Sequence, residues 1–114
     1  MTEAKQSEAD LMRSIMIALS NDGHFVCRAN VGLFFTKDGR PIRSGLPTGF
    51  SDIFGNRMGD AKAFYMEVKT PTGRATIEQL AFLNAMKIRG AIAGVVRSIE
   101  DAQALLRNSH QSVL

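Results

Sequence analysis

Several residue types that define whole classes of protein are scarce in this chain of 114 residues. Its one cysteine, Cys27, has no partner for an internal disulfide, and a thiolate metal site would lack its other ligands. The longest apolar runs, residues 15–19 and 91–96, are far shorter than the roughly 20 residues that span a bilayer. No segment recurs at the period of a repeat protein. The sequence therefore argues against a disulfide-stapled secreted domain, a helical membrane protein and a solenoid.

The amino-acid composition is that of an ordinary globular domain. Hydrophobic residues make up 45% of the chain and charged residues 22%, and the length suits one compact domain over residues 1–114. The first ten residues, MTEAKQSEAD, contain acids and no apolar stretch, which is unlike a signal peptide. We therefore expect an intracellular protein.

Basic residues gather in one middle segment of the chain. Lysines and arginines number 14 against 11 acids, for a net charge of +3. Between positions 27 and 51, however, four cations face one acid, Asp38; the cations are Arg28, Lys37, Arg40 and Arg43. A local basic excess of this kind favours a polyanionic partner such as nucleic acid.

The hydrophobic pattern predicts an α/β fold. Helices are expected over about residues 8–20, 76–90 and from 98 onward, with strands at 25–35, 51–54, 63–69 and 91–96. The order helix, three strands, helix, strand, helix predicts a mixed central sheet flanked by helices on both faces.

Residues 31–49, which run from the end of the first predicted strand toward the second, are less well defined by their sequence. Asp38-Gly39 predicts a tight turn, and residues 41–49, which are rich in Pro, Gly, Ser and Thr, predict a loop. The apolar segment Val31-Gly32-Leu33-Phe34-Phe35 is interpreted first as a buried core strand. The alternative is an interface or an exposed sheet edge.

Two acids and a lysine form the strongest candidate for chemistry. Glu67 and Lys69 lie two apart in the strand AFYMEVK, so their side chains leave the same face. If the preceding strand pairs as a hairpin, Asp52 meets Glu67, and a hard divalent cation with oxygen ligands would relieve the repulsion between the two carboxylates. The backbone carbonyl of Val68, between Glu67 and Lys69, is a further oxygen ligand. The non-functional alternative for Glu-x-Lys is a solvated ion pair, which is the commoner occurrence of this pattern.

Two more polar residues have both a structural and a functional interpretation. Glu8 lies at the centre of the apolar stripe of the first helix, although its charge also suits a helix N-terminus. Gln79 ends the capping-box pattern Thr76-x-x-Gln79, yet it shares a helix face with residues that point toward the sheet.

Four strings in this order resemble the VRR-NUC (virus-type replication–repair nuclease) domain of the PD-(D/E)XK nuclease superfamily. They are ANVG (residues 29–32), GFSDIFG (49–55), FYMEVKTPTGRAT (64–76) and EQLAFLNAMKIRGAIAGVV (78–96). The resemblance implies a restriction-endonuclease-like core in which Asp52, Glu67 and the Val68 carbonyl bind the metal. It further implies catalytic roles for Lys69, Gln79 and Glu8. Ser51 replaces the proline of the superfamily motif and leaves the acid in place.

The resemblance also implies an activity, partners and a location, the cytoplasm of a bacterial or phage-infected host cell. Stand-alone phage or bacterial forms of this domain are Mg²⁺- or Mn²⁺-dependent endodeoxyribonucleases that act as homodimers on branched DNA such as four-way (Holliday) junctions. In such an enzyme the backbone phosphates would contact Arg28, Lys37, Arg40, Arg43 and Arg74. Two alternatives stay open: a non-catalytic module that binds branched DNA, and a restriction-type enzyme that cuts duplex DNA.

Overall fold

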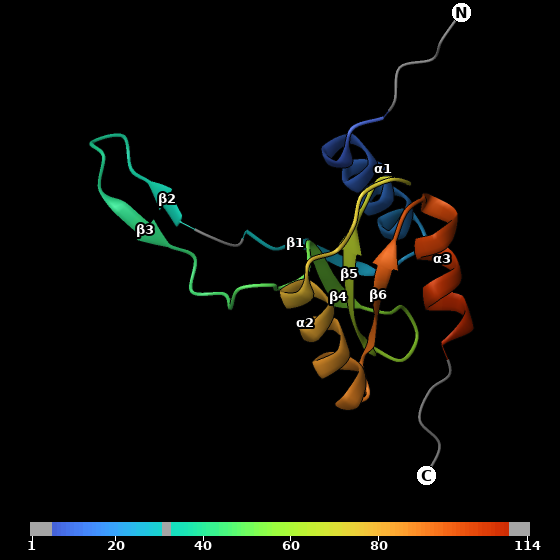
Figure 1. Cartoon of the computed structure of the whole chain (residues 1–114). Coiled ribbons are helices and arrows are strands. Elements are labelled where there is room, and N and C mark those ends of the chain that lie inside the picture. Colours follow the sequence, from blue (N-terminus) through green and yellow to red (C-terminus); the bar gives the residue numbers. More distant parts are fainter. Residues whose placement is uncertain (1–5, 31–32, 110–114) are drawn as a thin grey trace, which may run out of the picture.

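A mixed four-stranded sheet forms the centre of the computed structural model, which describes residues 6–30 and 33–109 (Figure 1). Its strands lie in the order β1-β4-β5-β6, with bounds β1 Phe25–Arg28, β4 Ile53–Asn56, β5 Ala63–Val68 and β6 Ile92–Val96. The first three are antiparallel neighbours, whereas β6 runs parallel to β5 after a helical crossover. The predicted α/β class and mixed sheet are confirmed.

Three helices cover the two faces of this sheet; they are α1 Glu8–Asn21, α2 Ile77–Ile88 and α3 Ile99–Asn108. Each begins at a side-chain cap, from Ser7, Thr76 and Ser98 respectively, which satisfies backbone N–H groups of the first turn. α1 and α3 share one face, while α2 packs on the other through Phe82 and Tyr65, whose ring centroids lie 5.6 Å apart.

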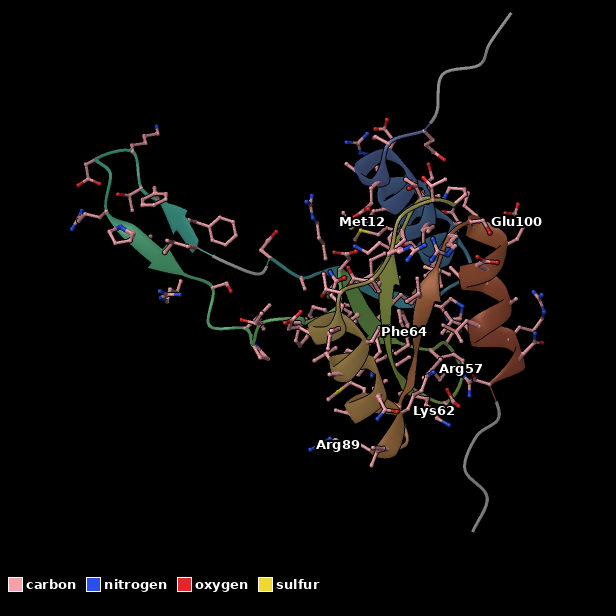
Figure 2. All side chains as sticks on the ribbon, in the orientation of Figure 1. Met12, Arg57, Lys62, Phe64, Arg89 and Glu100 are labelled. Carbon is pink, nitrogen blue, oxygen red and sulfur yellow. The ribbon has the colours of Figure 1, made fainter. Side chains whose placement is uncertain are left out.

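The hydrophobic core lies between the sheet and the α1–α3 pair. Alternate residues of β5, Phe64, Met66 and Val68, are fully buried there against the apolar stripe of α1. Figure 2 shows side chains crowded around Phe64 in the main body. Burying one such side chain contributes about 1.5–3 kcal/mol, so this layer fixes the direction in which β5 presents its remaining residues.

A second, two-stranded sheet corrects the sequence prediction for residues 25–49. β2 Leu33–Phe35 and β3 Pro41–Arg43 pair with each other and with no strand of the main sheet, and this hairpin arm extends away from the main body (Figure 1). The predicted single strand at 25–35 is therefore wrong, as is an entirely loop-like 41–49. The predicted tight turn at Asp38-Gly39 is confirmed, with Gly39 at φ 84°.

The interpretation of residues 31–35 as a buried core strand is also wrong where the structure describes them. Leu33, Phe34 and Phe35 have exposed fractions of 46%, 45% and 66%, and Val31 and Gly32 lie outside the described residues. The physical reason is that the arm is a single layer of two strands. A buried core strand needs a sheet or helix packed on each of its faces, and the described part of the arm does not have both.

No helix in the described part of the chain is both long and apolar enough to cross a membrane.

Candidate active site

The register of β4 and β5 brings Asp52 and Glu67 together. Ile53 pairs with Met66. Asp52, the residue just before β4, therefore lies opposite Glu67, the residue that follows Met66 in β5. The side-chain Oδ2 of Asp52 accepts a hydrogen bond of 2.9 Å from the Val68 backbone N–H, and the Asp52 carbonyl accepts another of 2.9 Å from Ala29. Asp52 is thus fixed between β1 and β5.

Glu67 is a carboxylate in a buried position, with an exposed fraction of 1%. Its Oε1 accepts a hydrogen bond of 2.9 Å from Gln79 Nε2 and lies 3.9 Å from Lys69 Nζ. Its Oε2 is buried and has no hydrogen-bond partner among the described residues. Burial raises the pKa of Glu67 to about 8; the neighbouring Asp52 adds to this rise, and the Lys69 ammonium opposes it.

Gln79 closes the capping box and also contacts the sheet. Its backbone N–H donates to Thr76 Oγ1 at 3.1 Å and its Oε1 accepts from the Thr76 backbone N–H at 2.8 Å, which is a complete capping box. The amide Nε2 is then left to donate to Glu67. The cap therefore fixes the direction in which Gln79 holds the Glu67 carboxylate.

The contacts around Glu67 suit a hard divalent cation. The buried Glu67 carboxyl approaches the partly buried Asp52, and one of its oxygens lacks a partner among the described residues, which is a costly arrangement. The Lys69 ammonium, 3.9 Å from the other oxygen, offsets this cost only in part, because the pKa of Glu67 is still raised. Mg²⁺ binds through one or two carboxylates and completes its shell with water and substrate phosphate. No group of three or more His, Cys, Asp or Glu suited to a metal occurs in residues 6–30 and 33–109.

Glu8 lies at the edge of this site. It is the first residue of α1 and is exposed, so it also occupies the position favoured by the helix dipole. Its negative charge contributes to the raised pKa of Glu67, which places it within electrostatic reach of the acids.

The predicted basic residues divide into two groups. Arg28, at the end of β1, lines a cavity beside Asp52, and Arg74 lies in the loop between β5 and α2. Lys37, Arg40 and Arg43 belong to the hairpin arm, where the Arg40 guanidinium lies 3.0 Å from Asp38 in an exposed ion pair. The structure thus brings Arg28 to the acids, while the three arm cations lie on a separate element.

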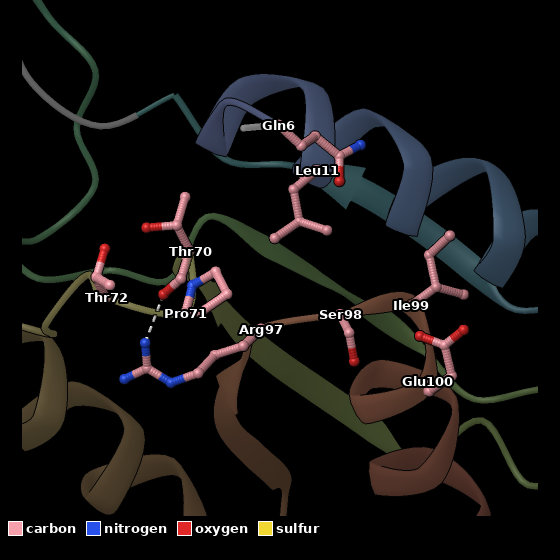
Figure 3. A pocket seen from close by; sticks show the side chains of 9 residues that line it. All are labelled: Gln6, Leu11, Thr70, Pro71, Thr72, Arg97, Ser98, Ile99 and Glu100. Atoms are coloured by element: carbon pink, nitrogen blue, oxygen red, sulfur yellow. Dashed lines mark hydrogen bonds between the residues drawn. The ribbon is translucent and has the colours of Figure 1, made fainter. Parts of the chain in front are cut away.

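The loop after Lys69 is held by Arg97. Its Nη1 donates to the carbonyls of Thr70 and Gly73 at 2.6 and 2.7 Å. Arg97 and Thr70 both line a cavity of about 450 Å³. Figure 3 shows the Arg97 guanidinium hydrogen-bonded to Thr70. This contact connects β6 to the segment that joins Lys69 to Gln79.

The cavity beside Asp52 has a volume of about 480 Å³ and contains residues that the sequence did not indicate. Besides Arg28, Asp52 and Gln79, its lining includes Phe34, Thr48 and Phe50. Gly49, at φ 85°, forms part of the same lining, and a Cβ at this position would lie 2.5 Å from the Glu78 carbonyl oxygen. Gly49 thus lets the backbone approach α2 closely. The sequence signal for this approach is the glycine at the start of the Gly-Phe-Ser-Asp string.

Two solved structures share this fold. One, described as "VRR_NUC domain", matches with a TM-score of 0.64 at 18% identity and covers 90% of this chain and 97% of that chain. Another, "VRR_NUC domain protein", matches with a TM-score of 0.66 at 15% identity, covering 93% of this chain and 89% of that chain. Neither a family model nor a curated protein matches the sequence. The chain therefore has the fold of VRR_NUC domain proteins, as the sequence resemblance predicted.

Proposed function

We propose that this protein is a DNA endonuclease that depends on Mg²⁺ or Mn²⁺. The observation that carries the proposal is the convergence of Asp52, Glu67, Lys69 and Gln79 from separate segments around a buried carboxylate oxygen without a partner. The fold shared with VRR_NUC domain proteins supports the same activity, because the sequence motifs that resemble this nuclease domain include these four residues.

Asp52 and Glu67, with the carbonyl of Val68, are the residues that would hold the cation. A bound Mg²⁺ or Mn²⁺ polarises a phosphate and lowers the pKa of an attacking water. Asp52 is oriented for this task by the Val68 N–H, and Glu67 by the Gln79 amide. The two acids therefore do not need to reorganise when substrate arrives, which is the basis of electrostatic preorganisation.

Lys69 and Glu8 act around this pair. The Lys69 ammonium, 3.9 Å from Glu67 Oε1, can orient a water and stabilise negative charge that develops on the phosphate. Glu8 adds negative charge at the rim of the site. We propose that Gln79, besides orienting Glu67, keeps the ammonium and the carboxylate from forming a closer ion pair.

The proposed substrate is branched DNA, in particular a four-way junction, cut by a homodimer. Arg28, Lys37, Arg40, Arg43 and Arg74 would contact backbone phosphates, which gives affinity without reading sequence. Paired cuts on a branched substrate require two active sites, and a two-fold dimer supplies them.

The test is cleavage of a synthetic four-way junction, with flap, splayed and plain duplex DNA alongside, in Mg²⁺ or Mn²⁺. Asp52→Asn and Lys69→Ala are expected to lower the cleavage rate by at least about 10²-fold. Lys87→Ala, at an exposed position in the last turn of α2, is the matched control and should keep wild-type activity. Equal cleavage by Asp52→Asn and wild type would reject the site. Tight binding with no product in any metal would instead identify a non-catalytic DNA-binding module.

Sedimentation of the free protein and of its complex with the junction tests the homodimer. A single copy on each junction, together with full cleavage, would contradict it.

A further inference from the structure

The cavity beside Asp52 lies between the main body and the hairpin arm. Met12, Arg28 and Asp52 line it from the main body, and Phe34 lines it from β2. Because Asp52 and Gln79 line the same cavity, any group bound there lies directly beside the proposed catalytic residues. Its volume of about 480 Å³ falls in the range of small-ligand sites.

Phe34 presents an unpaired aromatic ring to this cavity. Side chains alternate along a strand, so Phe34 and its neighbours Leu33 and Phe35 face opposite sides of β2. Leu33 accordingly lines a different cavity together with its register partner Arg43. Phe34 is 45% exposed, and no ring among the described residues stacks on it.

Phe50 forms a fixed wall of the same cavity. Its ring packs against Phe54, Tyr65 and Phe82, with centroid distances of 5.7, 6.0 and 4.6 Å. The two aromatic residues therefore differ. The ring of Phe50 already packs against other rings of the main body, whereas the face of the Phe34 ring is available to a ligand.

The charges around the cavity select the kind of ligand. The lining carries the carboxylates of Asp52 and Glu78 and the cation of Arg28. Arg28 is exposed and forms no ion pair with any described residue, so it is the group of this lining that is available to a phosphate. A flat apolar surface, an arginine and a neighbouring polar hydroxyl at Thr48 together match a nucleotide, whose base stacks while its phosphate pairs. Bases inside a duplex are stacked on both faces and cannot enter such a site without being unstacked.

We propose that this cavity holds an unpaired nucleotide adjacent to the scissile phosphate, with its base stacked on Phe34 and its phosphate at Arg28. The proposal rests on the proposed endonuclease function and specifies its substrate class: branched DNA in which at least one base beside the cut is unpaired or becomes unstacked at the branch point when the protein binds. Specificity for branched DNA then arises from one exposed base as well as from the overall shape of the junction.

The experiment measures stacking separately from cleavage. A four-way junction with a single unpaired 2-aminopurine at its branch point is titrated with protein in EDTA, since stacking on an aromatic ring quenches 2-aminopurine fluorescence. Wild type and Phe35→Ala should both quench the probe, because Phe35 lies on the other face of the same strand and does not line the cavity. Phe34→Ala should lose the quenching and bind the junction about 5- to 100-fold more weakly.

Rescue separates stacking from a structural effect on the arm. Phe34→Trp should restore the quenching, whereas Phe34→Leu, which keeps the apolar bulk, should not. Equal quenching by Phe34→Ala and Phe35→Ala would overturn the inference, as would equal quenching by Phe34→Leu and Phe34→Trp. If quenching depends on Phe34 but the wild type cleaves no DNA in Mg²⁺ or Mn²⁺, the nucleotide site stands and the endonuclease proposal fails.

Discussion

Replacing Glu67 by glutamine should change how the stability of the metal-free protein depends on pH. The substitution keeps the size of the side chain and an oxygen that accepts from Gln79, but it removes the titrating carboxyl. In the folded protein burial raises the pKa of Glu67 from 4.5 to about 8. Between these two pH values the folded chain retains a proton that the unfolded chain releases, so the free energy of unfolding falls as the pH rises.

The magnitude follows from this difference in pKa. The stabilising contribution is fully present below about pH 4.5 and is lost as the pH rises through about 8. Within that range each pH unit lowers the free energy of unfolding by about 1.4 kcal/mol. Between about pH 5.5 and 7.5 the loss is therefore about 2–3 kcal/mol, a large share of the 5–15 kcal/mol by which domains are stable.

Urea unfolding in EDTA, followed by far-UV circular dichroism, is the suitable assay, because the chain has no tryptophan to report by fluorescence. The difference between wild type and Glu67→Gln removes the contributions of the titrating groups that do not interact with Glu67. Glu100→Gln, at an exposed acid in the first turn of α3, is the control and should keep the wild-type slope. Saturating Mg²⁺ should flatten the wild-type slope, because a cation favours the ionised carboxyl. Parallel stability profiles for wild type and Glu67→Gln in EDTA would refute the reasoning.

Three further substitutions test the packing around the site. Gly49→Ala should cost about 2–4 kcal/mol in urea unfolding, because φ is positive and the new Cβ would meet backbone of α2 at 2.5 Å; Gly39→Ala, also at positive φ but in open space, should cost about 1 kcal/mol. Arg57→Ala should cost about 3 kcal/mol, since the half-buried guanidinium pairs with Asp60 and donates to two carbonyls at the end of α3, whereas the exposed Arg107→Ala should stay within about 0.5 kcal/mol of wild type. Arg97→Ala should speed hydrogen exchange in residues 70–75 while α1 keeps its protection; unchanged exchange there would show that the two carbonyl contacts do not hold the loop.

The main sheet could be predicted from the sequence because its signals are local. The four-residue spacing of Leu11, Ile15 and Leu19 defines the buried face of α1, and the continuous apolar run near Val96 defines a strand covered on both sides. The hairpin arm could not be predicted in the same way. Leu33-Phe34-Phe35 has the composition of a core strand, and whether a strand is covered depends on distant parts of the chain.

The candidate site likewise contains residues that could be predicted from the sequence and residues that could not. Asp52, Glu67 and Lys69 could be brought together from two short-range rules, the alternation of side chains along β5 and the antiparallel pairing of β4 with β5. Gln79 could be added to these residues because it shares a helix face with residues that point toward the sheet. Phe34 and Phe50 could not be assigned, because their place beside Asp52 depends on how the arm leaves and rejoins the main sheet.

The arm is an excursion from the main sheet whose two ends meet. The Ala29 N–H and the Asp52 carbonyl close its base with a hydrogen bond of 2.9 Å, and the described residues between them, Asn30 and 33–51, contribute no strand to the main sheet. An excursion closed in this way can be lengthened, shortened or exchanged while the four central strands keep their register. Sequence changes confined to the arm are therefore expected to leave Asp52 and Glu67 in place, and a chimera carrying another arm would keep both acids unchanged.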